Sequence, residues 1–351
     1  MPKKPDEIFA VPAAREEESY LLGLLGGVVR RRPLTGEEAL AALNSLERRA
    51  AEGDPKSQTE FARYLLTDAP DARRNRRALL LLKKAAASGL PEAIRLLGIV
   101  YMRGQGLSAD RRKGQELLHR AALLGSPGAA LEYARCCAEG IGRDASDRDA
   151  LHWLRIAAAA GSAEAAYAAG LFCRDGRGTP KDFEQAAEWL KKAAAKHHAP
   201  AQFALARLHQ NRLWEHADPE EARRWLHEAA LSGVADAQYR LGIAFWAGRG
   251  ERVNLREAVR WTCRAAENGS LQALSTLAGF FLTGNALPLS RFSAYCLLKE
   301  CEKLGDASAR ATLSSLRHLL TRSEQARARS VLRAAGGPKR LVETLLPREK
   351  R

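Results

Sequence analysis

The sequence has few aromatic residues and no long apolar run, and both absences limit what the protein is. Phe, Trp and Tyr make up 6% of the 351 residues, although apolar residues make up 46%. Alanine dominates the apolar set, which suits close contact between helices better than one large core. The apolar run at 20–29 is too short to span a membrane, and no small-residue cleavage site follows it. We therefore expect neither a signal peptide nor a transmembrane segment, and we predict a cytoplasmic protein.

Recognisable catalytic and metal-binding patterns are also missing. The eight histidines are scattered, and no pair has ligand spacing with a partnering carboxylate or cysteine. We find no nucleophile-and-base arrangement and no Walker-type loop. The sequence therefore predicts a protein that is not an enzyme and has no metal site and no cofactor.

What the chain does contain is a repeat with a period of 36 residues, which is typical of a solenoid built from stacked units. We predict seven regular units, at 55–90, 91–126, 127–162, 163–198, 199–234, 235–270 and 271–306. The flanking segments are predicted to be a disordered charged arm (1–18), a degenerate N-terminal capping repeat (19–54), C-terminal capping helices (307–337) and a basic tail (338–351). The pattern of the tail also allows one short amphipathic helix at its start.

Each unit has the pattern of two helices. Positions 3, 7, 8 and 11 are small or apolar, which places them on one face of a first helix. Position 8 is always Gly or Ala, so we expect another helix to cross there. A turn follows, often with a GxG triplet such as Gly176-Arg177-Gly178, and we interpret its glycines as ending the first helix rather than binding phosphate. The second helix carries Trp or Leu at position 27, and we expect Trp189 to be buried.

This pattern resembles the Sel-one-like repeat (SLR) family, a relative of the tetratricopeptide repeats. The family signature is matched in one unit by Ala165, Ala169-Gly170, Gly176-Arg177-Gly178, Ala186, Trp189 and Lys192-Ala193-Ala194. The resemblance implies an all-α, right-handed superhelical solenoid of antiparallel helix pairs. It also implies roles in assembling signalling or envelope-associated complexes. The unit at 199 departs from the pattern, because NRLWEHADP replaces its glycine turn.

The six cysteines fall at inconsistent positions in the units, so they do not form a recurring disulfide framework. We predict that they are reduced and mostly buried. Cys137 and Cys173 share position 11 of adjacent units, where a shared thiolate site is conceivable. The same position elsewhere holds Tyr101, Phe245 and Phe281, which favours buried packing residues.

In tetratricopeptide-like arrays, first-helix positions 2, 5, 9 and 12 line a concave groove. These positions mix aromatic residues with arginine here, a combination that is enriched at protein–protein contacts. The predicted partner-binding residues are Arg95, Arg135, Tyr167, Arg174, Phe203, Arg207, Tyr239 and Trp246.

A second candidate surface is basic. The formal net charge is +15, and residues 55–126 alone carry 14 basic and 6 acidic side chains. Two clusters fall at positions 19–23 of their units, at starts of second helices, where the helix dipole disfavours positive charge. Stacking of the units is predicted to align them as a basic ridge made of Arg73, Arg74, Arg76, Arg77, Arg111, Arg112 and Lys113.

The sequence thus favours a non-catalytic scaffold or adaptor that binds a protein or peptide in the groove, and its net positive charge favours an acidic partner. One alternative is an electrostatic binder of nucleic acid or another polyanion through the basic ridge. Another is a hydrolase like some cysteine-rich relatives, which would need paired, bridged cysteines in each unit. The sequence does not have these.

Overall fold

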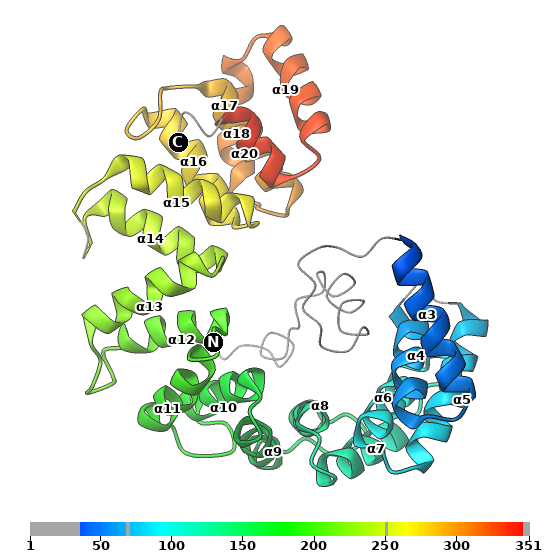
Figure 1. Cartoon of the computed structure of the whole chain (residues 1–351). Coiled ribbons are helices and arrows are strands. Elements are labelled where there is room, and N and C mark those ends of the chain that lie inside the picture. The colour runs from blue at the N-terminus through cyan, green and yellow to red at the C-terminus, as the bar shows by residue number, and fades with distance from the viewer. Residues whose placement is uncertain (1–35, 68–70, 250–251, 347–351) are drawn as a thin grey trace. The chain divides into compact units, whose positions relative to one another are not determined.

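A computed structural model describes residues 36–67, 71–249 and 252–346 of the chain. The predicted arm at 1–18 lies outside these residues. Every regular element in the described part is a helix, and the helices follow one another in sequential pairs (Figure 1). The chain divides into two compact units, a first that extends through Ala193 and a second that starts at Ala194. Each is described by itself below.

The first compact unit contains nine described helices. They are α3 (Gly36–Ala51), α4 (Pro55–Thr67), α5 (Ala72–Ala87), α6 (Pro91–Arg103), α7 (Arg111–Leu123), α8 (Pro127–Glu139), α9 (Asp147–Ala159), α10 (Ala163–Asp175) and α11 (Phe183–Ala194). The second contains α12 (Ala199–His209), α13 (Pro219–Leu231), α14 (Ala235–Ala247), α15 (Leu255–Glu267), α16 (Leu271–Thr283), α17 (Arg291–Lys303), α18 (Ala309–Leu319), α19 (Arg322–Ala335) and α20 (Pro338–Leu345). The first helix of every regular repeat begins at position 1 of its predicted unit.

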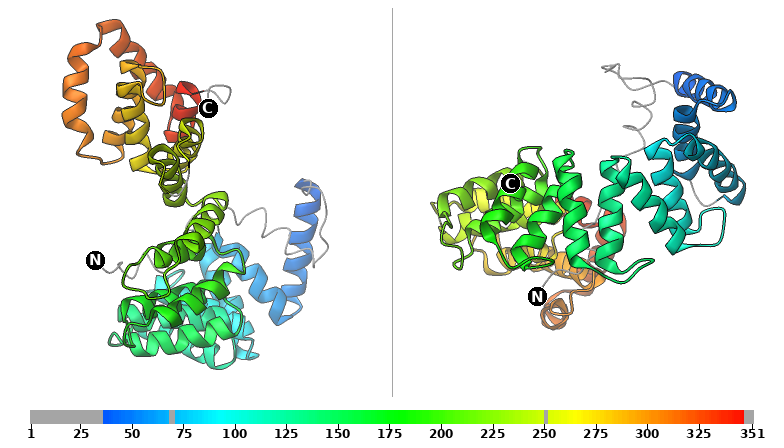
Figure 2. Two further views of the ribbon diagram at one scale, coloured as in Figure 1. Left: turned by 90° about the vertical axis from the view of Figure 1, so that its left-hand side faces the viewer. Right: turned by 90° about the horizontal axis from the view of Figure 1, so that it is seen from below.

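Local chemistry explains why each repeat forms a helix pair. Side chains such as Ser126, Ser162 and Ser270 accept a backbone N–H at the start of a first helix. Glycine in the left-handed region ends that helix, as Gly176 does at φ 74°. The chain then turns back, and the backbone N–H at position 20 donates to the carbonyl at position 11, as from Asp182 to Cys173 at 3.0 Å. Further views show the resulting antiparallel pairs (Figure 2).

The small residue at position 8 lies where the two helices of a pair cross, as predicted. A Cβ atom added to Gly98 would lie 2.9 Å from the Gly114 carbonyl oxygen, and one added to Gly170 would lie 2.7 Å from Leu190 Cγ. In the second compact unit, a Cβ atom on Gly242 would lie 2.6 Å from Thr262 Oγ1. The repeat therefore needs a small residue here because of close packing.

The second glycine of the GxG triplet has a separate role in the first compact unit. Gly142 lies against the backbone of Arg111, and Gly178 against that of Asp147, in each case at the start of the preceding repeat's second helix. A Cβ atom on Gly178 would lie 2.3 Å from the Asp147 carbonyl oxygen. The glycine turn thus packs directly against the preceding repeat. This contact supports the interpretation that the glycines serve the fold and do not bind phosphate.

The first part of the predicted basic tail forms the short amphipathic helix that its pattern allows. This helix, α20, packs on α15, α17 and α19, so residues 338–346 belong to the folded structure. Leu341 and Val342 are fully buried, and Leu346 is nearly so. Two apolar neighbours in a short amphipathic helix, started by Pro338, are enough to add it to the core.

The tryptophans at position 27 are less buried than predicted. Trp189 is half-buried, and the Lys192 ammonium lies 4.1 Å from its ring centroid. Trp261 is the buried member of the series at 6% exposed. Most of these rings therefore cover a helix pair from the edge, with one face toward a basic side chain.

Candidate partner-binding face

The predicted arginines of the first compact unit lie in a ladder of ion pairs. Arg95 places Nε and Nη2 2.8 and 2.7 Å from the two carboxylate oxygens of Glu92. Arg63, from the preceding repeat, also pairs with Glu92. In the next repeat Arg135 lies 2.7 Å from Glu132. These residues hold positions 2, 5, 6 and 9 of successive first helices, and their charges are largely neutralised within the chain.

The charges of this ladder shift the pKa values of the carboxylates that belong to it. Burial alone would raise the pKa of Glu92, but the guanidinium groups of Arg95 and Arg63 outweigh it and hold that pKa below its usual value. Glu164 shows the opposite balance, because burial and the nearby Glu132 carboxylate raise its pKa. On α10, the carboxylate of Glu164 is therefore easier to protonate than an ordinary glutamate.

Two further predicted residues of this compact unit offer little to a partner. Tyr167 is only 8% exposed and belongs to the buried face of α10. Arg174 makes a bidentate contact with its neighbour Asp175, at 2.7 and 2.8 Å. We leave both out of the proposal below, because a buried ring and a saturated guanidinium group provide little new contact.

The second compact unit presents a less saturated face. First-helix positions 2 and 5 of the repeats at 235 and 271, together with Ser308 of the capping segment, line a hollow of about 640 Å³. Tyr239, Asp236, Gln272 and Ser275 hold these positions. Ser275 donates to Asp306 at 3.2 Å, and Thr276 lies 3.5 Å from the Tyr239 hydroxyl. The structure thus brings positions 2 and 5 together, as the repeat pattern predicts.

The other predicted residues of this compact unit are accessible to different degrees. Trp246, at position 12 of α14, is 42% exposed and contacts Phe280 at a ring distance of 6.2 Å. Arg207, at position 9 of α12, is exposed. Phe203 is half-buried, with the Arg240 guanidinium 5.8 Å from its ring centroid. Trp246 and Tyr239 are the aromatic groups of this set that a partner can reach.

The predicted basic ridge is also present at the starts of α5 and α7. Every one of its seven residues is exposed except Arg74, which is half-buried. Several cations are already engaged within the chain: Arg77 with Glu47, Arg112 with Glu116, and Lys113 over Tyr101. The turn that leads into Arg111 packs on the backbone at Asn75, so the two clusters lie on the same edge.

The cysteines are free thiols and all six are buried, as predicted. Burial raises the pKa of Cys136 to about 12 and that of Cys296 to about 11. Cys137 lies 3.7 Å from the Arg143 guanidinium, whereas Cys173 lies 3.3 Å from the Gln185 amide oxygen. In the part of the chain that the structure describes, no group of three or more His, Cys, Asp or Glu could hold a metal ion.

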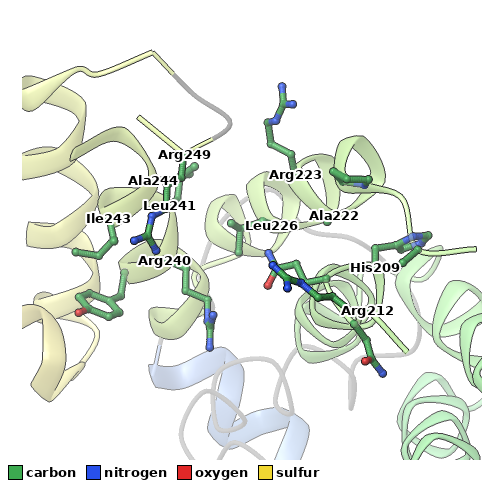
Figure 3. A pocket seen from close by; sticks show the side chains of 15 residues that line it. His209, Arg212, Ala222, Arg223, Leu226, Arg240, Leu241, Ile243, Ala244 and Arg249 are labelled. Carbon is green, nitrogen blue, oxygen red and sulfur yellow. The ribbon is translucent and has the colours of Figure 1, made fainter. Parts of the chain in front are cut away.

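One feature that sequence reasoning missed is a pocket at the unusual turn of the repeat at 199. It has a volume of about 610 Å³ and is lined by residues from the end of α12, the 210–219 turn, α13 and α14 (Figure 3). The sequence does indicate that this turn is different. NRLWEHADP replaces the glycine turn here, whereas the neighbouring repeats at 163 and 235 keep a GxG triplet. Which side chains would surround the resulting space followed only from the structure.

Comparison with known families assigns the fold to a class. The architecture defines a repeat protein of stacked helix pairs. The Sel1 repeat model matches residues 70–90, 91–126, 127–162, 163–198, 199–234 and 235–270, which is more than half of the chain. The protein therefore belongs to the Sel1 repeat family. The predicted repeats at 19–54 and 271–306 lie outside the matched residues.

The chain is also similar to solved structures. A Sel1 repeat protein from Oxalobacter formigenes is 23% identical, with a TM-score of 0.57 over 65% of this chain and 90% of that one. A protective antigen of uropathogenic Escherichia coli with an SLR fold is 17% identical (TM-score 0.35, 86% of this chain and 96% of that one). An immunity protein from Pseudomonas aeruginosa is 18% identical (TM-score 0.35, 70% and 82%). Comparison with curated protein sequences gave no significant match.

No described helix has the length and apolar composition that crossing a membrane would require.

Proposed function

We propose that this protein is a non-catalytic scaffold or adaptor that binds a protein segment along the first-helix face of its second compact unit. The observation that carries the proposal is the hollow at positions 2 and 5, which is lined by Tyr239 together with Asp236 and Ser308. Trp246 adds an exposed aromatic ring on the same helix as Tyr239. Aromatic residues within a polar rim are what protein contacts use most.

Site-specific photo-crosslinking tests this proposal. A photoreactive phenylalanine at Tyr239 or Gln272 should crosslink the same protein from a lysate of the native host, identified by mass spectrometry. The matched control is the same group at Arg256, an exposed residue on α15 outside the hollow. Equal crosslinking from Arg256 would show that the first-helix face has no special role.

Alanine substitution adds a second test, since Tyr239 and Trp246 contribute little to the fully buried core. The double variant Tyr239→Ala/Trp246→Ala should lose most partner capture while it keeps its helical circular dichroism. Capture at the original level by a folded variant would refute the assignment of the face.

One observation favours a second function, the binding of a polyanion by the basic ridge. Arg73, Arg76 and Arg111 are exposed on one edge of the first compact unit, and no ion pair within the described residues involves them. Such a cluster binds phosphate backbones through charge alone, so the affinity would fall steeply with salt. We rank this function second because the ridge offers charge without exposed aromatic rings on which bases could stack.

A further inference from the structure

The pocket at the turn of the 199 repeat exists because this turn is built differently. In five other repeats the position 20 N–H donates to the position 11 carbonyl, for example from Asn254 to Phe245 at 3.0 Å. Here the Asp218 N–H donates instead to the ring Nδ1 of His209, at 3.3 Å. The His209 ring also packs on Trp214, with 4.7 Å between ring centroids. The side chain at position 11 has taken over a backbone bond, and the turn is reshaped around two rings.

This rearrangement leaves an open space within the second compact unit. Trp214 is 7% exposed and fills the inside of the turn, while the 210–219 segment lines the pocket together with α13 and α14. The volume of about 610 Å³ lies within the range of about 300–1,000 Å³ that ligand sites occupy. The space is large enough for several side chains of a bound peptide.

The charge of the pocket has one sign. Four arginines line it (Arg212, Arg223, Arg240 and Arg249), and no carboxylate is among the lining residues (Figure 3). Arg223 pairs with Glu220 at the edge. Arg212 and Arg249 are exposed, and neither takes part in an ion pair among the described residues. Guanidinium groups in this arrangement favour carboxylate or phosphate groups, which they contact with paired hydrogen bonds.

The apolar part of the lining narrows the choice of ligand. The accessible apolar lining comes from Tyr239, Ile243 and Ala244 of α14, which are half-buried, whereas Leu226 and Leu241 lie buried beneath it. A ligand that fills the pocket therefore needs carboxylates for the arginines and an apolar side chain for Tyr239 and Ile243. A nucleic-acid strand fits less well, because its binding sites track the backbone with extended basic grooves and stack bases on several aromatic rings.

The geometry points to a docking site for an acidic peptide segment, one that presents carboxylates around at least one large apolar side chain. The inference rests on the proposed protein-binding function and specifies the chemistry of the partner. Tyr239 lines both this pocket and the hollow of the first-helix face, so a segment bound in the pocket continues directly onto that face.

Fluorescence anisotropy with the full chain tests the site. The probe is a labelled, acetylated ten-residue peptide of Asp, Glu and Leu, and its matched control replaces Asp and Glu by Asn and Gln. We expect the acidic peptide to bind at least about tenfold more tightly than the neutral one. Equal binding of the two peptides, or no binding of the acidic one, would overturn the inference.

Variants locate the binding. Arg212→Gln/Arg249→Gln should weaken binding of the acidic peptide by about tenfold or more. The control Arg256→Gln/Arg291→Gln removes the same charge from exposed positions of the same compact unit that lie outside the pocket, and it should bind as the natural protein does. An equal loss in both variants would show that overall charge, not the pocket, attracts the peptide.

Two further measurements keep the outcome clear. If circular dichroism shows that the double Gln variant is misfolded, we replace it with Arg212→Lys/Arg249→Lys. This variant keeps the charge but cannot form the paired hydrogen bonds of arginine, so it should still bind the acidic peptide more weakly than the natural protein does. Displacement of the peptide by inorganic phosphate or a single-stranded oligonucleotide at lower concentration than by unlabelled peptide would contradict a peptide site. If a host protein is crosslinked at Gln272 but the acidic peptide does not bind, only the assignment of the pocket is refuted. If neither crosslinking nor peptide binding is observed, the proposed protein-binding function is refuted as well.

Discussion

His197 occupies a position where the neighbouring repeats place glycine. It has φ 57°, and it is the one described non-glycine residue in the left-handed region. The equivalent residues Gly161 and Gly233 have φ 97° and 88°. The next residue, His198, caps α12 by accepting the Ala201 N–H on Nδ1 at 3.3 Å. Two adjacent histidines thus replace a glycine and a serine-like cap without changing the path of the chain.

Replacement of His197 by glycine should stabilise the protein. The left-handed conformation costs an L-residue about 1–2 kcal/mol, part of which is offset because glycine loses more backbone entropy on folding. We expect His197→Gly to raise the free energy of unfolding by about 0.5–1 kcal/mol in urea titration. Lys196→Gly, one residue earlier, gains no such relief and should destabilise; stabilisation by both changes would contradict the explanation.

The His198 cap predicts a dependence on pH. Burial lowers the pKa of His198 in the folded protein, so the folded state prefers the neutral ring. The stability that this ring contributes is present above its ordinary pKa and is lost as the pH falls through the lowered one. The melting temperature of the natural protein should therefore fall more between pH 7.5 and 5 than that of His198→Asn, whose cap does not titrate. Parallel curves would show that His198 is not responsible.

At the level of the elements, two glycines of a repeat have different roles. One follows the second helix, and the other is the second glycine of the GxG turn. Gly125 ends a second helix at φ 85° with no neighbour within 4 Å of an added Cβ atom. Gly178 has a similar φ of 70°, but it lies against the backbone of the preceding repeat. The first glycine is needed for conformation alone, and the second for conformation and contact.

Alanine substitution separates these roles. Gly125→Ala should cost about 1 kcal/mol, from backbone conformation. Gly178→Ala should cost about 3 kcal/mol or more, because the Asp147 carbonyl cannot move away without opening the seam between repeats. Chemical denaturation of both variants measures the difference, and equal costs would show that the seam yields easily.

The short C-terminal helix is a second case in which an element matters more than its composition suggests. Its segment is basic, yet α20 buries Leu341 and Val342 against α15 and α17. Leu341→Ala should lower the free energy of unfolding by about 2–5 kcal/mol, as for other buried leucines. The exposed Lys339→Ala should change it by less than about 0.5 kcal/mol. Similar small effects in both would show that α20 contributes little to the core.

At the level of the whole molecule, the positive charges that are not paired with carboxylates gather in a different kind of place in each compact unit. In the first compact unit it is concentrated on the basic ridge, whereas on the first-helix face Arg95 and Arg135 are matched by carboxylates. In the second, four arginines surround one pocket. A net charge of +15 therefore does not by itself indicate a nucleic-acid-binding protein.

The ridge makes a prediction that distinguishes charge from position. If the protein binds a DNA duplex, Arg73→Gln/Arg76→Gln/Arg111→Gln should reduce the slope of log affinity against log salt by about 2–3. Lys84→Gln/Arg103→Gln/Arg120→Gln removes three exposed cations from the same compact unit and should reduce it less. Equal reductions would mean that the duplex responds only to total charge, and no binding at low salt would exclude this function.

Much of the architecture was predictable from the sequence because its causes are local and recur. A small residue at position 8, a glycine after the first helix and a period of 36 residues are each visible in the letters, and Gly170 and Gly176 have the roles that these patterns predict. The candidate face was only partly predictable. The sequence places Arg95 and Tyr167 at groove positions, but it does not show that Glu92 neutralises one and that packing buries the other.

The sequence by itself determined that the chain is a series of helix pairs, since each helix boundary depends on residues within its own repeat. The tertiary structure decided which of the repeated positions are left for a partner, because burial and ion pairing depend on what the neighbouring repeat presents. Arg135 and Arg207 both hold position 9 of their first helices, yet one is paired and the other exposed. The arginine pocket depends in the same way on three segments that meet around a turn reshaped by His209 and Trp214.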